Sequence, residues 1–132
     1  MRVFVDTSAF LAVLDAGDLN HSKAAQSWEK LILSEEPLIC HNYILVETLA
    51  LIQSRFGMKA VRVFNDDVVP LISIEWIDEV IHKAATSALI AASKRKLSFV
   101  DCVSFEVMRQ LGVEVIFAFD SHFAKQGFRC IP

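Results

Sequence analysis

The chain has 132 residues, of which 54% are hydrophobic and 22% are charged, and its formal net charge is −3. This length predicts a single domain, residues 1–132, and the composition excludes a disordered or repetitive protein. No apolar run approaches the roughly 20 residues that cross a bilayer, and a charged residue comes too early for a signal-peptide core, so we expect a cytoplasmic protein without membrane association. The acidic balance counts against nucleic-acid binding but does not exclude it, because bound cations reverse the sign of an acidic site.

Strand and helix signals alternate along the whole chain. The predicted strands are residues 2–5, 38–40, 71–76, 115–119 and 128–131. The first predicted helix begins at residues 7–8, and the second begins at 20–22 and is stopped by Pro37. Further helices are predicted at 43–56, capped by Asn42 and ended by Gly57, and at 59–66, 78–94 and 100–111. This alternation predicts an α/β fold, a three-layer α/β/α sandwich with a mostly parallel central sheet. Ligands of such sheets gather at the carboxyl ends of the strands.

Four of the sixteen acidic residues lie in apolar surroundings, where an unpaired carboxylate costs several kcal/mol to bury. Asp6 and Asp120 each follow a predicted strand, and Glu47 and Asp101 interrupt apolar helices. A single carboxylate at a strand end is usually a helix cap or an ion-pair partner, but four acids with almost no neighbouring lysine or arginine are harder to explain in this way. Mg²⁺ or Mn²⁺ takes oxygen ligands from several carboxylates, so the four acids are candidates for a metal site.

The segments around these acids resemble the motifs of PIN domains, and more narrowly those of the VapC-type toxins of type II toxin–antitoxin pairs. The motifs are Val-Asp-Thr-Ser-Ala-Phe at 5–10, Val-Glu-Thr at 46–48, Leu-Ser-Phe-Val-Asp-Cys-Val-Ser-Phe-Glu-Val-Met at 97–108 and Phe-Asp-Ser-His-Phe-Ala-Lys-Gln-Gly-Phe at 119–128. The opening motif alone is weak, whereas the two last motifs are specific in order and spacing. No acidic position of the family pattern is missing.

This resemblance implies an endoribonuclease that depends on Mg²⁺ or Mn²⁺ and hydrolyses RNA phosphodiester bonds. It implies that Asp6 and Asp101 bind the metal directly, that Asp120 completes the first site, and that Glu47 either binds a second ion or orients the attacking water. It also implies a toxin with a small antitoxin partner and a homodimer. The alternatives are a stand-alone PIN-domain RNA-processing nuclease without an antitoxin, and a catalytically silent PIN-fold module that binds proteins.

Four hydroxyl residues are candidates for binding the scissile phosphate or for holding the acids in place. Thr7, Ser8 and Ser121 adjoin two of the acids, although simple helix capping explains Thr7 and Ser8 equally well. Ser104 lies three residues after Asp101 on the same helical face, so it either steadies that carboxylate or forms a hydrogen bond between helices.

The histidines and the basic residues have less specific patterns. For His41 and His122, which lie near the expected site, we predict structural hydrogen bonds rather than a role as general base. Contacts to RNA would come from local basic patches at Arg55, Lys59 and Arg62 or at 94–96. Either patch is more often a solvated helix end than a binding surface.

Overall fold

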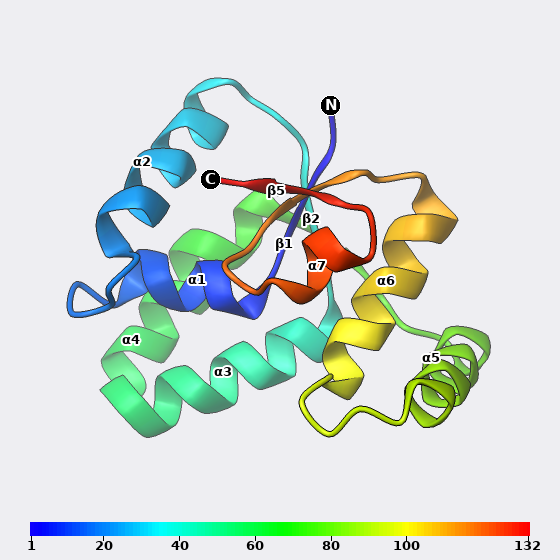
Figure 1. Ribbon diagram of the computed structural model, residues 1–132. Helices are drawn as coiled ribbons and strands as arrows, with labels where there is room; N and C mark the ends of the chain where they lie inside the picture. Colours follow the sequence, from blue (N-terminus) through cyan, green and yellow to red (C-terminus); the bar gives the residue numbers. More distant parts are fainter.

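Five parallel strands form the central sheet, in the order β3-β2-β1-β4-β5 (Figure 1). The computed structural model describes residues 1–132. The strands are β1 (Val3–Val5), β2 (Leu38–His41), β3 (Ile72–Glu75), β4 (Val115–Phe117) and β5 (Arg129–Ile131). All residues of β1, β2 and β4 are buried, because helices cover both faces of the sheet. Strands in this position read as continuous apolar runs.

Seven helices connect and cover these strands. They are α1 (Thr7–Leu14), α2 (His21–Leu33), α3 (Asn42–Phe56), α4 (Met58–Val63), α5 (Glu79–Ala92), α6 (Phe99–Leu111) and α7 (His122–Lys125). The chain moves along the sheet in one direction from β1 to β3 and in the other from β3 to β5. Since crossovers between parallel strands are right-handed, α1 to α4 lie on one face and α5 to α7 on the other. Figure 1 shows this separation of α1–α4 from α5 and α6, and the predicted three-layer sandwich is confirmed, with a wholly parallel sheet.

The start of α3 differs from the prediction in its capping residue. His41, not Asn42, is the N-cap, and its Nδ1 accepts a hydrogen bond of 3.2 Å from the Ile44 N–H. Asn42 is the first helical residue, and its side-chain oxygen accepts a hydrogen bond of 2.7 Å from the Ile77 N–H, which ties α3 to the segment after β3. Gly57 ends the helix as predicted, at φ +86°, where a side chain would be strained.

Some predicted bounds are wrong. The helix predicted at 59–66 is the short α4, which continues as a π-helical turn at Phe64–Val68 and a 3-10 turn at Val69–Leu71. The strand predicted at 115–119 ends at Phe117. Helix α7 was not predicted, because its four residues are too few to give a periodic pattern.

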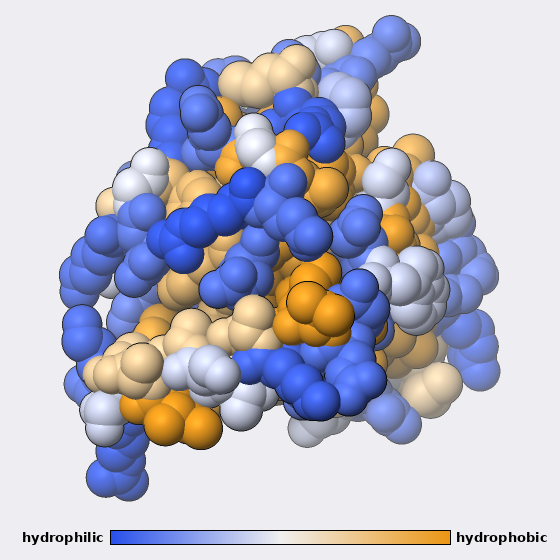
Figure 2. Space-filling view, turned by 90° about the vertical axis from the view of Figure 1, so that its right-hand side faces the viewer, coloured by the Kyte–Doolittle hydropathy of each residue, from blue (hydrophilic) through white to orange (hydrophobic).

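One continuous core fills the space between the layers. It contains 29 buried hydrophobic residues, and the largest side chains that are fully buried include Phe4, Phe10, Phe64, Phe117 and Phe123. The space-filling view in Figure 2 shows apolar side chains exposed between polar ones on one face of the molecule. None of the helices combines the length and the apolar character that a membrane span requires.

Candidate active site

A pocket of about 280 Å³ lies at the carboxyl edge of the sheet. All four acids predicted from the sequence line it, although they come from separate parts of the chain. Asp6 directly follows β1, Glu47 comes from α3, Asp101 from the first turn of α6, and Asp120 from the loop after β4. The complete lining consists of Asp6, Thr7, Ser8, Leu11, Glu47, Leu51, Lys96, Ser98, Asp101 and Asp120.

Asp6 is the N-cap of α1 and is only 4% exposed. Its Oδ2 accepts hydrogen bonds from the Ser8 N–H at 3.1 Å and from the Ser8 hydroxyl at 2.6 Å. The pKa of Asp6 is nevertheless raised from 3.8 to about 6, mainly by burial. The hydrogen bonds from Ser8 lower the pKa, and repulsion from Glu47 and Asp120 raises it further. Burial is therefore the main reason for the raised pKa of this helix cap, and the neighbouring acids are a smaller one.

Asp101 lies in the first turn of α6 and is 6% exposed. Its N–H donates a hydrogen bond of 3.0 Å to the hydroxyl of Ser98, the N-cap of this helix. Burial, followed by repulsion from Asp6 and Asp120, raises the pKa of Asp101 from 3.8 to about 7. No lysine or arginine forms an ion pair with any of the four acids, and the only ionisable group paired with one of them is His122, whose Nε2 lies 3.9 Å from Asp120 Oδ1.

Two of the predicted hydroxyl residues connect the elements around the pocket. The hydroxyl of Ser8, besides donating to Asp6, accepts a hydrogen bond of 3.0 Å from the Phe119 N–H. It therefore holds the loop that carries Asp120 against the start of α1. Thr7 is buried, and its hydroxyl accepts a hydrogen bond of 3.1 Å from the hydroxyl of Thr48, which links α1 to α3 beside Glu47.

The other two predicted hydroxyls do not line the pocket. Ser104 is fully buried, and its hydroxyl donates to the Val100 carbonyl at 3.1 Å and lies 2.8 Å from His41 Nε2. Because Nδ1 of His41 accepts a hydrogen bond, Nε2 carries the proton and donates to Ser104. The hydrogen bond joins α6 to the end of β2, whereas the alternative role that we considered for Ser104 was a hydrogen bond between helices. Ser121 is exposed.

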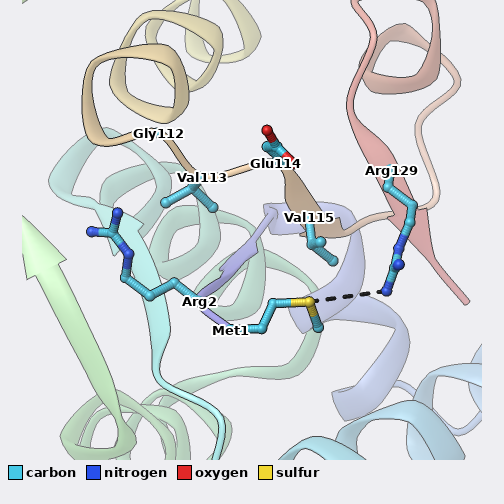
Figure 3. A pocket seen from close by; sticks show the side chains of 7 residues that line it. All are labelled: Met1, Arg2, Gly112, Val113, Glu114, Val115 and Arg129. Carbon is cyan, nitrogen blue, oxygen red and sulfur yellow. Dashed lines mark hydrogen bonds between the residues drawn. The ribbon is translucent and has the colours of Figure 1, made fainter.

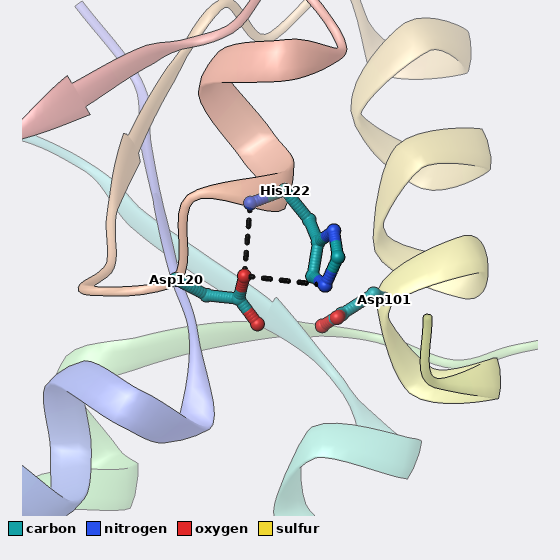
Figure 4. A group of neighbouring side chains, drawn as sticks. All are labelled: Asp101, Asp120 and His122. Atoms are coloured by element: carbon teal, nitrogen blue, oxygen red, sulfur yellow. Dashed lines mark hydrogen bonds and ion pairs between the residues drawn. The ribbon is translucent and has the colours of Figure 1, made fainter. Parts of the chain in front are cut away.

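The predicted structural role of His41 is confirmed by these two hydrogen bonds, and burial lowers the pKa of its ring to about 3, so the ring is neutral. The same prediction for His122 is wrong, since its ring makes no hydrogen bond. Its Nε2 lies 3.9 Å from Asp120 Oδ1 (Figure 4), although His122 does not itself line the pocket.

Comparison with known proteins agrees with this geometry. The sequence description of the PIN domain matches residues 3–129. The chain belongs to the PIN domain family. A relative from Mycobacterium tuberculosis, the 23S rRNA-specific endonuclease VapC20, is 34% identical over 128 residues, which are 96% of this chain and 95% of the relative. The resemblance to VapC-type proteins that we inferred from the four motifs is thereby confirmed.

Two solved structures are similar to this PIN domain. The crystal structure of VapC20 from Mycobacterium tuberculosis, described as a sarcin-ricin loop cleaving toxin, superimposes with a TM-score of 0.82 at 32% identity, covering 96% of this chain and 95% of that one. FitAcB from Neisseria gonorrhoeae superimposes with a TM-score of 0.71 at 15% identity, covering 100% of this chain and 97% of that one. The second likeness supports the fold alone.

Lys96 and Ser98 also line the pocket of this PIN domain, and neither was predicted individually from the sequence. Residues 94–96 were treated as one basic patch, but only Lys96 lines the pocket, while Lys94 and Arg95 do not. The pattern Ser98-x-x-Asp101 is a helix-start signature and would have placed Ser98 beside the acid. The approach of Lys96 depends on the path of the loop between α5 and α6, which no local pattern predicts.

The residues present fit a hard divalent cation. The acids offer carboxylate oxygens, the ligand type that Mg²⁺ and Mn²⁺ take in proteins. The raised pKa values of Asp6 and Asp101 show that the pocket disfavours its own negative charge. A cation bound among the four carboxylates would relieve this repulsion.

Proposed function

We propose that this PIN domain is a Mg²⁺- or Mn²⁺-dependent endoribonuclease that hydrolyses RNA phosphodiester bonds. The observation that carries the proposal is the convergence of four carboxylates in one pocket without a lysine or arginine ion pair. The similarity to an rRNA endonuclease over 96% of the chain supports RNA as the substrate class. A divalent ion bound here would activate a water molecule and neutralise charge on the leaving oxygen.

The four acids have different parts in this proposal. Asp6, Asp101 and Asp120 would hold the ion, and a bound cation would offset the repulsion between the buried carboxylates of Asp6 and Asp101. Glu47 is half-buried on α3 and either binds a second ion or accepts a hydrogen bond from the attacking water and so orients it. Ser8 positions two of the acids, because it bonds both Asp6 and the loop of Asp120.

Lys96 supplies the cation of the protein that contacts the RNA backbone at the pocket. It is exposed and lines the pocket without an ion pair to the acids, so its ammonium group is free to meet a phosphate. This contact is needed because the net charge of −3 gives the protein no general attraction for RNA. Since the relative VapC20 is a 23S rRNA-specific endonuclease, 23S rRNA is the first substrate to test.

We infer the biological setting from the same relative. The chain would act as a toxin in the cytoplasm, and a small antitoxin protein would neutralise it. The toxin role predicts that expression of the chain arrests growth and that expression of the Asp101→Asn variant does not. A stand-alone processing nuclease would lack a neighbouring gene for a small antitoxin.

A homodimer belongs to the proposal because large apolar side chains remain exposed. Trp76 and Val80, around the start of α5, are 71% and 75% exposed. Exposed large apolar side chains of this kind favour a protein contact. The mass in solution, measured by light scattering for the wild type and for Val80→Lys, tests this part, and a monomeric wild type would contradict it.

RNA cleavage tests the main proposal. Purified protein is incubated with 23S rRNA in Mg²⁺, in Mn²⁺ and with chelator, and Asp101→Asn is compared with Glu106→Gln, which removes an acid from the same helix outside the pocket. We expect cleavage with metal, none with chelator, none by Asp101→Asn and normal cleavage by Glu106→Gln. Cleavage that persists with chelator, or full activity of Asp101→Asn, would contradict the mechanism. A silent protein-binding module would cleave RNA under none of these conditions.

A further inference from the structure

The four histidines of the chain differ in what their rings contact. Rings of His21, His41 and His82 each have a hydrogen-bond partner in the protein, at 2.8, 2.8 and 2.6 Å. The ring of His122 has none, although its side chain is only 25% exposed. A three-quarters buried imidazole without a hydrogen bond requires another explanation for its orientation.

The ring of His122 points at two of the acids. One ligand atom from each of Asp101, Asp120 and His122 lies within 4.8 Å of the other two, and His122 Nε2 is 3.9 Å from Asp120 Oδ1. Figure 4 shows the ring and the two carboxylates around a common point, although they come from α6, the loop after β4 and the start of α7. Two donors on opposite sides of an ion with bonds of about 2.1 Å are about 4.2 Å apart, so small side-chain rotations close this group around an ion.

The fold holds His122 in place relative to the acids. Its backbone N–H donates a hydrogen bond of 2.9 Å to Asp120 Oδ1, which fixes the start of α7. The next residue, Phe123, is fully buried and packs edge-to-face on Phe105 of α6, with ring centroids 5.3 Å apart. Because α6 also carries Asp101, this contact anchors the histidine and that carboxylate to the same helix. The ring is therefore held in position rather than free on the surface.

We propose that His122 is a nitrogen ligand of the divalent ion, together with Asp101 and Asp120, and that it favours Mn²⁺ over Mg²⁺. The inference rests on the proposed metal-dependent function and adds to its four carboxylates. Mg²⁺ is a hard ion that takes oxygen ligands almost exclusively, whereas transition-metal ions also accept imidazole nitrogen. A site with one imidazole and two carboxylates therefore prefers Mn²⁺ to Mg²⁺ more strongly than a site of carboxylates alone.

An ion pair between a protonated His122 and Asp120 is the competing explanation for the 3.9 Å approach. It needs no metal and places no nitrogen next to an ion. The two explanations therefore differ in a spectroscopic property of bound Mn²⁺, and this property can be measured without RNA and without catalysis.

Pulsed electron paramagnetic resonance of Mn²⁺ bound to the full chain tests the proposal. We expect nitrogen couplings from a coordinated imidazole in the wild type, with the isotope shift that histidine labelled with ¹⁵N produces. The couplings should disappear in His122→Gln and remain in His82→Gln, a matched change of a histidine that does not belong to this group. Calorimetry should show a roughly 10- to 100-fold weaker affinity of His122→Gln for Mn²⁺, with less than about a threefold change for Mg²⁺.

The outcomes separate this inference from the proposed function. If Asp101→Asn abolishes Mn²⁺ binding while the wild type shows no nitrogen coupling, His122 is not a ligand and the inference is wrong, but the carboxylate site stands. If Asp101→Asn binds Mn²⁺ as tightly as the wild type, the metal site itself is wrong. Equal losses of Mn²⁺ and Mg²⁺ affinity in His122→Gln would overturn the proposed selectivity. The labelled wild type answers the question of ligation even if His122→Gln does not fold.

Discussion

The two ends of the sheet have pockets of nearly the same size and opposite character. At the amino end, a pocket of about 300 Å³ is lined by Met1, Arg2, Gly112, Val113, Glu114, Val115 and Arg129 (Figure 3). Acidic and basic groups are mixed there, the Arg2 guanidinium donates to the Leu111 carbonyl, and the amino terminus forms an ion pair of 2.9 Å with Glu36. At the carboxyl end, a pocket of about 280 Å³ is lined by four carboxylates and one lysine without such a pair.

Unbalanced charge, and not cavity size, distinguishes the candidate site from the pocket at the amino end. The helix ends explain the difference. Helices α1 and α6 begin at the carboxyl edge, where the positive ends of their dipoles favour Asp6 at the cap and Asp101 in the first turn. Helix α6 ends at the amino edge, where its free carbonyls favour a cation, and Arg2 bonds one of them. At the carboxyl end four acids line one pocket, and none of them forms an ion pair with a lysine or arginine.

The largest effect should come from removing one acid at the carboxyl end, with the removal of one acid at the amino end as the control. Asp101→Asn takes away a proposed oxygen ligand of the ion, and we expect RNA cleavage to fall by about 100-fold or more. Glu114→Gln, which removes an acid from the pocket at the amino end, should leave cleavage unchanged. Initial rates on the same RNA measure both. Similar losses in the two variants would break the distinction between the ends.

The next effect concerns basic residues that line the two pockets. Lys96→Ala should raise KM about tenfold with a smaller change in kcat. It should also reduce the slope of log affinity for RNA against log salt concentration by about the amount that one phosphate contact contributes. Lys94→Ala, two residues away in the same loop but outside the pocket, and Arg129→Ala at the amino end should change neither value. Steady-state rates and binding curves at several salt concentrations provide the measurement. An equal effect of Lys94→Ala would mean that the loop contributes only general charge.

The stability of the metal-free protein should depend on pH through the acidic pocket. The folded-state pKa values of Asp6, about 6, and Asp101, about 7, lie above the ordinary value of 3.8. Between the unfolded-state and folded-state pKa values, the folded state therefore binds more protons than the unfolded state. The stability contributed by the protonated carboxyls of Asp6 and Asp101 is complete below about pH 4 and is lost as pH rises through 6 and 7. Asp101→Asn should raise the melting temperature at pH 8 by about 4 to 8 °C and should have little effect at pH 4.

Thermal melts with chelator, recorded by circular dichroism, test this sign. Saturating Mn²⁺ should stabilise the wild type at pH 8 and should not stabilise Asp101→Asn. The pH profile of Glu114→Gln should follow that of the wild type. A variant that melts lower than the wild type at pH 8 without metal would show that the pocket does not carry excess negative charge.

The smallest effect should come from the amino end alone. Arg2→Met removes the donor to the last turn of α6 and should lower the stability by about 0.5–1 kcal/mol. Cleavage of RNA should be unaffected, because the proposed site lies at the other end of the sheet. Denaturant unfolding together with the initial rate separates the two properties. A loss of activity larger than the loss of stability would connect the amino end to function.

The four acids of the candidate site and the parallel sheet that brings them together were predictable from local sequence. An acid inside an apolar run is expensive to bury wherever the run folds, so Asp6, Glu47, Asp101 and Asp120 could be selected without knowledge of the fold. The alternation of strands and helices then predicted a parallel sheet, which brings the residues that follow strands to one edge. Both inferences rest on properties of single segments, and the structure brings all four acids into one pocket.

The partners of single polar side chains were decided only by the tertiary structure. Ser104 was as well placed to support Asp101 as to bond another element, and the packing of α6 against the end of β2 gives it His41 instead. Lys96 lines the pocket and Lys94 does not, although both lie in the loop between α5 and α6, and His122 meets Asp101 because α7 packs on α6. Burial cost is a property of a segment and is visible in sequence, whereas a hydrogen bond or a ligand set depends on distances of a few ångströms between segments that only the packed fold determines.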